Sequence, residues 1–120
     1  MRHPVLTQLI SPREADVAKA IVEFLALRGC FVYRQNAGGV VERNSGSFIR
    51  LAPEGASDWT GWVMRGPHAG KAIQCEIKTR GNKPTVQQRA WLELAASHGV
   101  IAFWANSVEM AEEALRRYGV

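Results

Sequence analysis

The sequence predicts an α/β fold in which a mixed sheet is flanked by helices. Three stretches carry apolar residues at helical spacing, one near the start of the chain, one after its middle and one at its end. Between them lie short segments that are rich in β-branched and aromatic residues or that alternate between apolar and polar side chains. Helices before, between and after strands are typical of a sheet that helices cover.

Length and composition indicate a single globular domain over residues 1–120. Hydrophobic residues make up 47% of the chain and charged residues 22%, which is ordinary for a folded protein. Two cysteines exclude a disulfide framework, and we expect a reducing, cytoplasmic compartment. No apolar run approaches the roughly 20 residues of a membrane helix, so we expect no membrane partner. A net charge of +4 is compatible with a polyanionic partner without proving one.

The first predicted helix covers 12–28. Ser11 is expected as its N-cap, with Pro12 at the first position and Glu14 at the third. Gly29 ends it. One face of this helix forms an apolar stripe, which consists of Val17, Ala18, Ile21, Phe24 and Leu25.

Two further helices are expected at 84–97 and 108–117. Pro84 can open the first of them, and Ser107 is a suitable N-cap for the second. The predicted strands are shorter. They cover 30–34, 58–64, 71–79 and 100–105, with a further short strand at 48–51.

Glu76, Ile77 and Lys78 form the first chemically suggestive segment. Successive side chains of a strand point to opposite faces, so Glu76 and Lys78 share a face about 6.6 Å apart, while Ile77 takes the other. A strand covered by helices is normally apolar on both faces. The segment is therefore either an edge strand with a solvated polar face or part of a functional site.

Asp58 favours the functional interpretation. It begins the strand before Glu76, and an antiparallel hairpin between the two strands would bring both carboxylates together. Converging carboxylates favour a divalent cation, and hard oxygen ligands suit magnesium. A neighbouring Lys78 could then orient or protonate an attacking water, which is a unit suited to metal-assisted phosphodiester hydrolysis. The alternative for Asp58 is a turn-forming aspartate after a glycine.

Other polar residues have both a functional and a structural interpretation. Glu14 heads the apolar stripe and can reach toward the sheet, but it also suits a capping box. Gln87 and Gln88 are expected on the inward side of their helix, unless they are surface residues of its first turn. Arg34 can clamp a phosphate and Asn36 can donate to one, although both also fit an ordinary strand end.

Several of these stretches together resemble the signature of the PD-(D/E)XK nuclease superfamily, and within it the VRR-NUC family. Its pattern of an aspartate followed by glutamate-x-lysine is matched by Asp58 and Glu76-Ile77-Lys78. The resembling stretches are Glu14-Ala15-Asp16-Val17, Tyr33-Arg34-Gln35-Asn36-Ala37-Gly38, Gly55-Ala56-Ser57-Asp58, Cys75-Glu76-Ile77-Lys78-Thr79 and Gln88-Arg89-Ala90-Trp91. One departure is Ser57, which stands where the pattern has proline.

The resemblance implies a restriction-endonuclease-like fold with an α-β-β-β-α-β-α core. It implies a Mg²⁺ (or Mn²⁺) site formed by Glu14, Asp58, Glu76 and the backbone carbonyl of Ile77. Lys78 would be the catalytic lysine, and Gln88 would be a supporting glutamine that belongs to the same catalytic set. We further expect DNA contacts from Arg34, Asn36, Lys71 and Lys83.

Stand-alone members of the family, which are bacterial or phage-encoded, imply a homodimer that cuts branched DNA such as four-way (Holliday) junctions. The activity expected from the resemblance is therefore a Mg²⁺-dependent endodeoxyribonuclease. Two alternatives remain open at this point. One is a non-catalytic DNA-binding module with the same fold, and the other is a nuclease subunit that acts only within a larger complex or on RNA.

Overall fold

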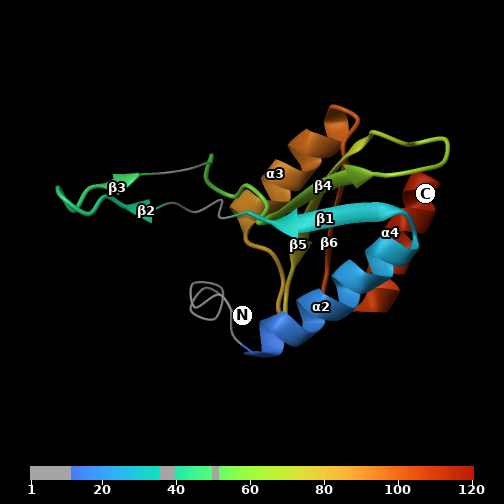
Figure 1. Cartoon of the computed structure of the whole chain (residues 1–120), viewed down its shortest axis with the longest axis horizontal. Coiled ribbons are helices and arrows are strands. Elements are labelled where there is room, and N and C mark those ends of the chain that lie inside the picture. The colour runs from blue at the N-terminus through green and yellow to red at the C-terminus, as the bar shows by residue number, and fades with distance from the viewer. Residues whose placement is uncertain (1–11, 36–39, 50–51) are drawn as a thin grey trace.

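The computed structural model describes residues 12–35, 40–49 and 52–120. Its elements follow the expected order, with helices at each end of the described chain and one between the last two strands (Figure 1). The helices are α2 (Pro12–Leu27), α3 (Val86–Ser97) and α4 (Val108–Tyr118). The strands are β1 (Cys30–Arg34), β2 (Val40–Val41), β3 (Phe48–Ile49), β4 (Trp59–Val63), β5 (Ala72–Ile77) and β6 (Ile101–Ala105).

The central sheet has four strands in the order β1-β4-β5-β6. β4 is antiparallel to β1 and β5, whereas β6 runs parallel to β5, so the predicted mixed sheet is confirmed. The parallel step follows from chain connectivity, because α3 provides the crossover that two parallel strands need. β5 lies between two neighbours, and the edge-strand interpretation of Glu76 is therefore wrong.

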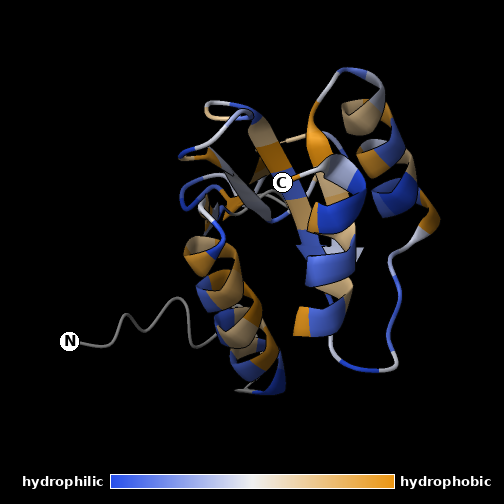
Figure 2. Ribbon diagram, turned by 90° about the vertical axis from the view of Figure 1, so that its right-hand side faces the viewer, coloured by the Kyte–Doolittle hydropathy of each residue, from blue (hydrophilic) through white to orange (hydrophobic). Residues whose placement is uncertain are grey.

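Helices cover the two faces of the sheet unequally. α2 and α4 pack against each other and against one face, where the main core includes Ile21, Leu25 and Leu115. α3 packs on β5 and β6 and contacts Gln74, which points away from the core residues on either side of it. α3 therefore covers the opposite face, over β5 and β6. Each helix carries hydrophobic and hydrophilic residues in alternating bands, as expected for helices that bury one side (Figure 2).

Some helix and strand boundaries differ from the expected ones. α3 begins at Val86 rather than at position 84, because Thr85 is its N-cap. Gly29 ends α2 as expected, with a left-handed φ of 82°. Of the short strand expected at 48–51, residues 48 and 49 form β3, which pairs with β2 in a separate hairpin apart from the four-stranded sheet, and residues 50 and 51 lie outside the described residues (Figure 1). Ser11 and Asn36 lie outside the described residues.

Both cysteines are buried and unbonded, as expected for core residues. Within the ranges that the structure describes, no helix has the length and apolar character required to cross a bilayer.

Candidate active site

The pairing of β4 with β5 brings Asp58 and Glu76 to the same level of the sheet. Trp59 lies opposite Cys75, so the next position in each direction places Asp58 beside Glu76. The main-chain oxygen of Asp58 also accepts from the amide of Gln35, at 2.6 Å, which extends the pairing of β4 with the β1 side. The hairpin expected from the sequence is thus present.

Glu76 is a buried carboxyl group. Only 4% of the residue is exposed, and its Oε1 atom lies 3.6 Å from Lys78 Nζ. The pKa of Glu76 is raised from 4.5 to about 7, chiefly by burial, with Lys78 opposing the rise and Asp58 adding to it. The carboxyl group therefore loses its proton near neutral pH. A cation bound beside it would strongly favour the ionised form.

Helix α3 aims Gln88 at Glu76 through its own N-cap. The Thr85 hydroxyl accepts from the Gln88 amide at 3.1 Å, and Gln88 Oε1 accepts from the Thr85 amide at 2.9 Å. These bonds form a capping box, which satisfies two of the free donors at the start of the helix. With its oxygen engaged there, the side chain turns Nε2 toward Glu76 Oε1, to which it donates at 3.2 Å. The expected supporting role of Gln88 now has a geometric basis.

Asp58 pairs with a cation, and the loop that carries it packs against the first turn of α3. Arg34 Nη2 lies 3.5 Å from Asp58 Oδ2, and the Arg34 side chain is mostly buried. Three residues before Asp58, Gly55 has a left-handed φ of 87° and leaves no room for a side chain. An added Cβ there would lie 2.4 Å from the carbonyl oxygen of Gln87. The loop that carries Asp58 is thus packed directly onto the backbone of α3.

A small cavity of about 30 Å³ joins these groups. Its lining brings together the three predicted acidic residues and their neighbours, namely Glu14, Ala18, Arg34, Asp58, Trp59, Glu76 and Ile77. Glu14 is exposed and enters from the first turn of α2, above the buried residue Ala18. A water needs only about 10–15 Å³ by such a measure, so the cavity has room for a water or a small ion.

Unpaired polar atoms mark the same place. Among the described residues, three buried side-chain atoms have no hydrogen-bond partner: Glu76 Oε2, Arg34 Nε and Ser57 Oγ. Two of the three belong to residues that line the cavity, and the third precedes Asp58. Buried polar atoms are nearly always satisfied, so this concentration indicates a bound water, ion or substrate atom.

The donor set fits Mg²⁺ or Mn²⁺ by its chemistry. Asp58 and Glu76 supply hard carboxylate oxygens, and Ile77 lies at the same cavity. Among residues 12–35, 40–49 and 52–120, no group of three or more His, Cys, Asp or Glu side chains is placed to hold a metal ion. Mg²⁺ is commonly bound by one or two carboxylates and keeps several waters, so two carboxylates are sufficient. The assignment of Glu14 as a third ligand stays a prediction.

The remaining predicted residues are distributed unevenly. Lys71 is exposed just before β5, at the end of that strand away from Glu76, and Lys83 is exposed in the loop that leads to α3. Neither lines the cavity. The expectation that Gln87 faces inward is wrong, because the residue is exposed, and it is its backbone carbonyl and Cβ that lie against Gly55.

Sequence reasoning missed two polar features beside the site. Thr85 is the partner that orients Gln88, and the Thr-x-x-Gln spacing of a capping box was the signal for it. The other is a chain in which Trp91 Nε1 donates to Gln74 at 3.0 Å and Gln74 Nε2 donates to Thr60 at 2.8 Å. No sequence motif predicts this series of hydrogen bonds, because its three residues come from three separate elements.

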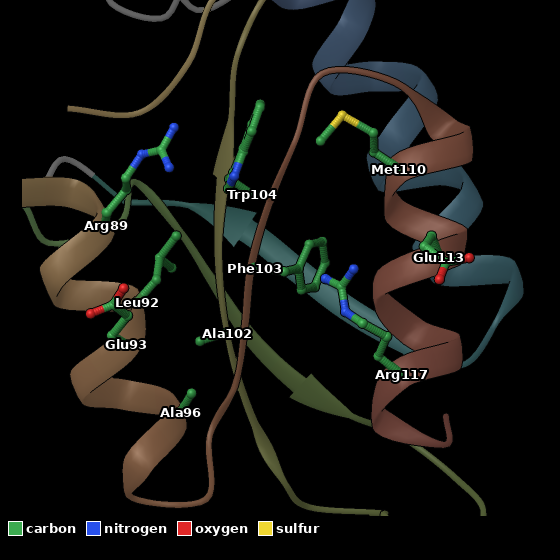
Figure 3. A pocket seen from close by; sticks show the side chains of 10 residues that line it. All are labelled: Arg89, Leu92, Glu93, Ala96, Ala102, Phe103, Trp104, Met110, Glu113 and Arg117. Atoms are coloured by element: carbon green, nitrogen blue, oxygen red, sulfur yellow. The ribbon is translucent and has the colours of Figure 1, made fainter. Parts of the chain in front are cut away.

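A larger groove lies elsewhere. It has a volume of about 460 Å³ and runs along β6 between α3 and α4, with Arg89 and Glu93 on one side and Glu113 and Arg117 on the other (Figure 3). None of the predicted catalytic residues lines it. The groove is therefore separate from the smaller cavity that Asp58 and Glu76 line.

Comparison with known proteins supports the fold. A solved structure described as a VRR_NUC domain is similar to this chain, with a TM-score of 0.58 and 19% sequence identity. The similarity covers 90% of this chain and 99% of that one. No family model matches the sequence, and no curated protein matches it significantly. The chain therefore has the restriction-endonuclease-like fold of a VRR-NUC domain, as its sequence led us to expect.

Proposed function

We propose that this protein is a divalent-metal-dependent endonuclease that hydrolyses DNA phosphodiesters at the Asp58–Glu76 cavity. The observation that carries the proposal is Glu76 Oε2, a buried carboxylate oxygen without a partner among the described residues, in a residue that also lines a cavity with Asp58 and Arg34. The likeness in fold to a VRR_NUC domain supports the same activity.

The side chains around the cavity have distinct chemical tasks in this proposal. Asp58 and Glu76 would hold the metal ion, which supplies Lewis acidity and an activated water when bound. Arg34 can pass from Asp58 to a phosphate oxygen, because guanidinium groups bind both. Lys78 orients the attacking water and stabilises the negative charge that develops on the phosphate. Water adds to phosphorus, the bond to the 3′ oxygen breaks, and the products are a 5′ phosphate and a 3′ hydroxyl.

Gln88 acts as a positioning residue. Its amide is fixed at both ends, by Thr85 and by Glu76, so it holds one oxygen of the carboxylate and leaves the other, Oε2, available to hold a cation. Orienting hydrogen bonds of this kind commonly affect metal affinity as strongly as a weak ligand does.

The finer substrate assignment is also part of the proposal. We propose branched DNA, such as a four-way junction, as the substrate and a homodimer as the active species. The support is that the described chain carries one candidate catalytic cavity with the Asp58–Glu76 pair, whereas resolving a junction requires two symmetric cuts. Molar mass in solution, measured by light scattering with and without junction DNA, tests the dimer directly.

A cleavage panel tests the activity. Four-way junction, flap, splayed-arm and duplex DNA are each incubated with Mg²⁺, Mn²⁺ or a chelator, using wild type, Lys78→Ala and Glu76→Gln. We expect metal-dependent cutting by wild type, no cutting by either variant, and retained DNA binding by both. Lys19→Ala, which removes an exposed lysine of α2, is the matched control and should cut normally. Wild-type rates from Lys78→Ala would refute the mechanism, and DNA binding without cleavage on any substrate would favour the non-catalytic module.

A further inference from the structure

Three aromatic rings form an exposed cluster on the part of the sheet that α3 leaves uncovered. Phe31, Tyr33 and Trp62 are 40%, 44% and 46% exposed. The Phe31 and Trp62 ring centroids lie 5.1 Å apart, and Tyr33 lies 5.7 Å from Phe31 and 6.5 Å from Trp62. We call these three residues the aromatic face. Solvent-exposed rings gathered on one surface usually mark a binding site.

The aromatic face lies on the same side of the sheet as Glu76. Residues directly opposite each other on antiparallel strands point to the same face, and Tyr33 is opposite Thr60, which is opposite Gln74. Glu76 follows Gln74 by two positions and so shares its orientation. The aromatic face and the candidate catalytic carboxyl thus lie on the same side of the sheet, the rings exposed and Glu76 covered by the start of α3.

The spacing along the strands relates this surface to the proposed cut. Trp62 is four residues from Asp58 along β4, or about 13 Å, and Tyr33 is two residues from Gln35, which pairs with Asp58, or about 7 Å. Successive nucleotides of one strand are about 3.4 Å apart in duplex DNA and farther apart in an extended single strand. The rings therefore lie within about four nucleotides of a phosphate bound at Asp58.

Basic residues stand next to the aromatic face at the ends of its strands. Arg34, whose guanidinium group is paired with Asp58, follows Tyr33, and exposed Lys71 precedes Ala72, the residue opposite Trp62. These cations lie at strand ends and not over the rings, so a polyanionic backbone could contact them where it enters and leaves the aromatic face. A second copy of the chain is a poorer fit. The exposed parts of three rings provide about 300 Å², well below the roughly 800 Å² per partner of a stable interface.

From these observations we infer that the aromatic face binds unpaired nucleobases by stacking, so that the substrate must be single-stranded within a few nucleotides of the cut. Bases inside a duplex cover one another's faces, whereas unpaired bases expose them to aromatic side chains. The inference rests on the proposed function for the position of the cut. It adds the requirement that distinguishes flaps, splayed arms and opened junctions from intact duplex.

Binding in the presence of a chelator tests the inference without cleavage. Fluorescence anisotropy is measured with the full chain on oligothymidylate and on blunt duplex, comparing wild type with Trp62→Leu and Trp62→Phe. Trp62→Leu keeps apolar area and removes the ring, so we expect at least about fivefold weaker binding to oligothymidylate and little change on duplex. Trp62→Phe should bind like wild type. Leu94→Ala, which removes another exposed apolar side chain on α3, should have no effect on either substrate.

Stacking is observed directly by placing 2-aminopurine in the oligothymidylate, where its fluorescence should be quenched by wild type and less so by Trp62→Leu. Thermal melting confirms that the variants fold. The inference is overturned if wild type does not bind oligothymidylate, if Trp62→Leu binds it normally, if the loss is equal on duplex, or if Trp62→Leu instead changes the molar mass. A chain that binds through Trp62 but cuts no DNA would keep the inference and refute the nuclease. If wild type cuts DNA but Trp62→Leu binds oligothymidylate as tightly as wild type does, the nuclease proposal stands and the inference about the aromatic face is refuted.

Discussion

Replacing the Glu76 carboxyl by an amide, in Glu76→Gln, tests the physical state of the candidate site without any substrate. The native pKa of about 7 lies above the ordinary value of 4.5, so the folded state holds this proton more tightly than the unfolded state does. That contribution to the free energy of unfolding is fully present below about pH 4.5 and is lost as the pH rises through about 7. The pKa difference corresponds to about 3 kcal/mol.

Urea unfolding of metal-free wild type and Glu76→Gln between about pH 5 and about pH 9 measures this loss. The amide has a similar volume and does not titrate. The free energy of unfolding of the variant should therefore rise relative to that of wild type by about 3 kcal/mol as the pH increases. Every other ionisable group is common to both proteins, so the difference between them isolates Glu76. A constant offset would only reflect altered contacts with Lys78 or Gln88. If the difference between the two proteins did not change with pH, Glu76 would not be the buried, proton-binding carboxyl described above.

Three further outcomes follow from the contacts of the site. Gln88→Ala should lower the free energy of unfolding by about 1 kcal/mol and should lower the cleavage rate, because it removes the bonds to Thr85 and Glu76. Gln88→Glu should keep the cap with Thr85 and move the pH-dependent loss of stability to higher pH, since a second carboxylate raises the pKa of Glu76. Equal behaviour of the two variants would contradict this geometry. Gly55→Ala should destabilise by about 1–3 kcal/mol in the same assay, because its Cβ meets the Gln87 carbonyl and its φ is left-handed, and a neutral result would argue against the packed loop. Mg²⁺ at a hundredfold excess over its Kd should stabilise wild type by about 3 kcal/mol in thermal melts and leave Glu76→Ala unchanged, and an equal response would place the ion elsewhere.

The sequence predicted the parts of the site that depend on local patterning. Alternation in the strand predicted at 71–79 placed Lys78 beside Glu76, and the two side chains lie 3.6 Å apart although β5 itself ends at Ile77. The hairpin between β4 and β5 accounts for the nearness of Asp58. Helical spacing placed Ala18 and Ile21 on the buried face of α2, as the structure confirms. Each of these relations spans either a few residues or one pair of neighbouring strands, and such relations are fixed by strand and helix periodicity.

Features set by tertiary contact were beyond the reach of the sequence. Gln87 and Gln88 are chemically identical, and only the start of α3 at Val86 decides which of them faces the sheet. The exposure of the aromatic face depends on how far α3 extends over the sheet. From the sequence alone, large aromatic residues in a strand, such as Phe31 and Trp62, are expected in the core. Periodicity shows that a residue has a face but not what covers it.

The amide of Gln88 makes the start of a helix part of the candidate active site. Its Oε1 closes the first turn of α3 and its Nε2 holds Glu76, so fraying of that turn removes both bonds at once. If α3 has not formed, the Glu76 carboxylate would therefore lack its orienting hydrogen bond even when the sheet is complete. Protection of the Thr85 amide from hydrogen exchange would then report, from a backbone position, whether Glu76 is held in the arrangement described above.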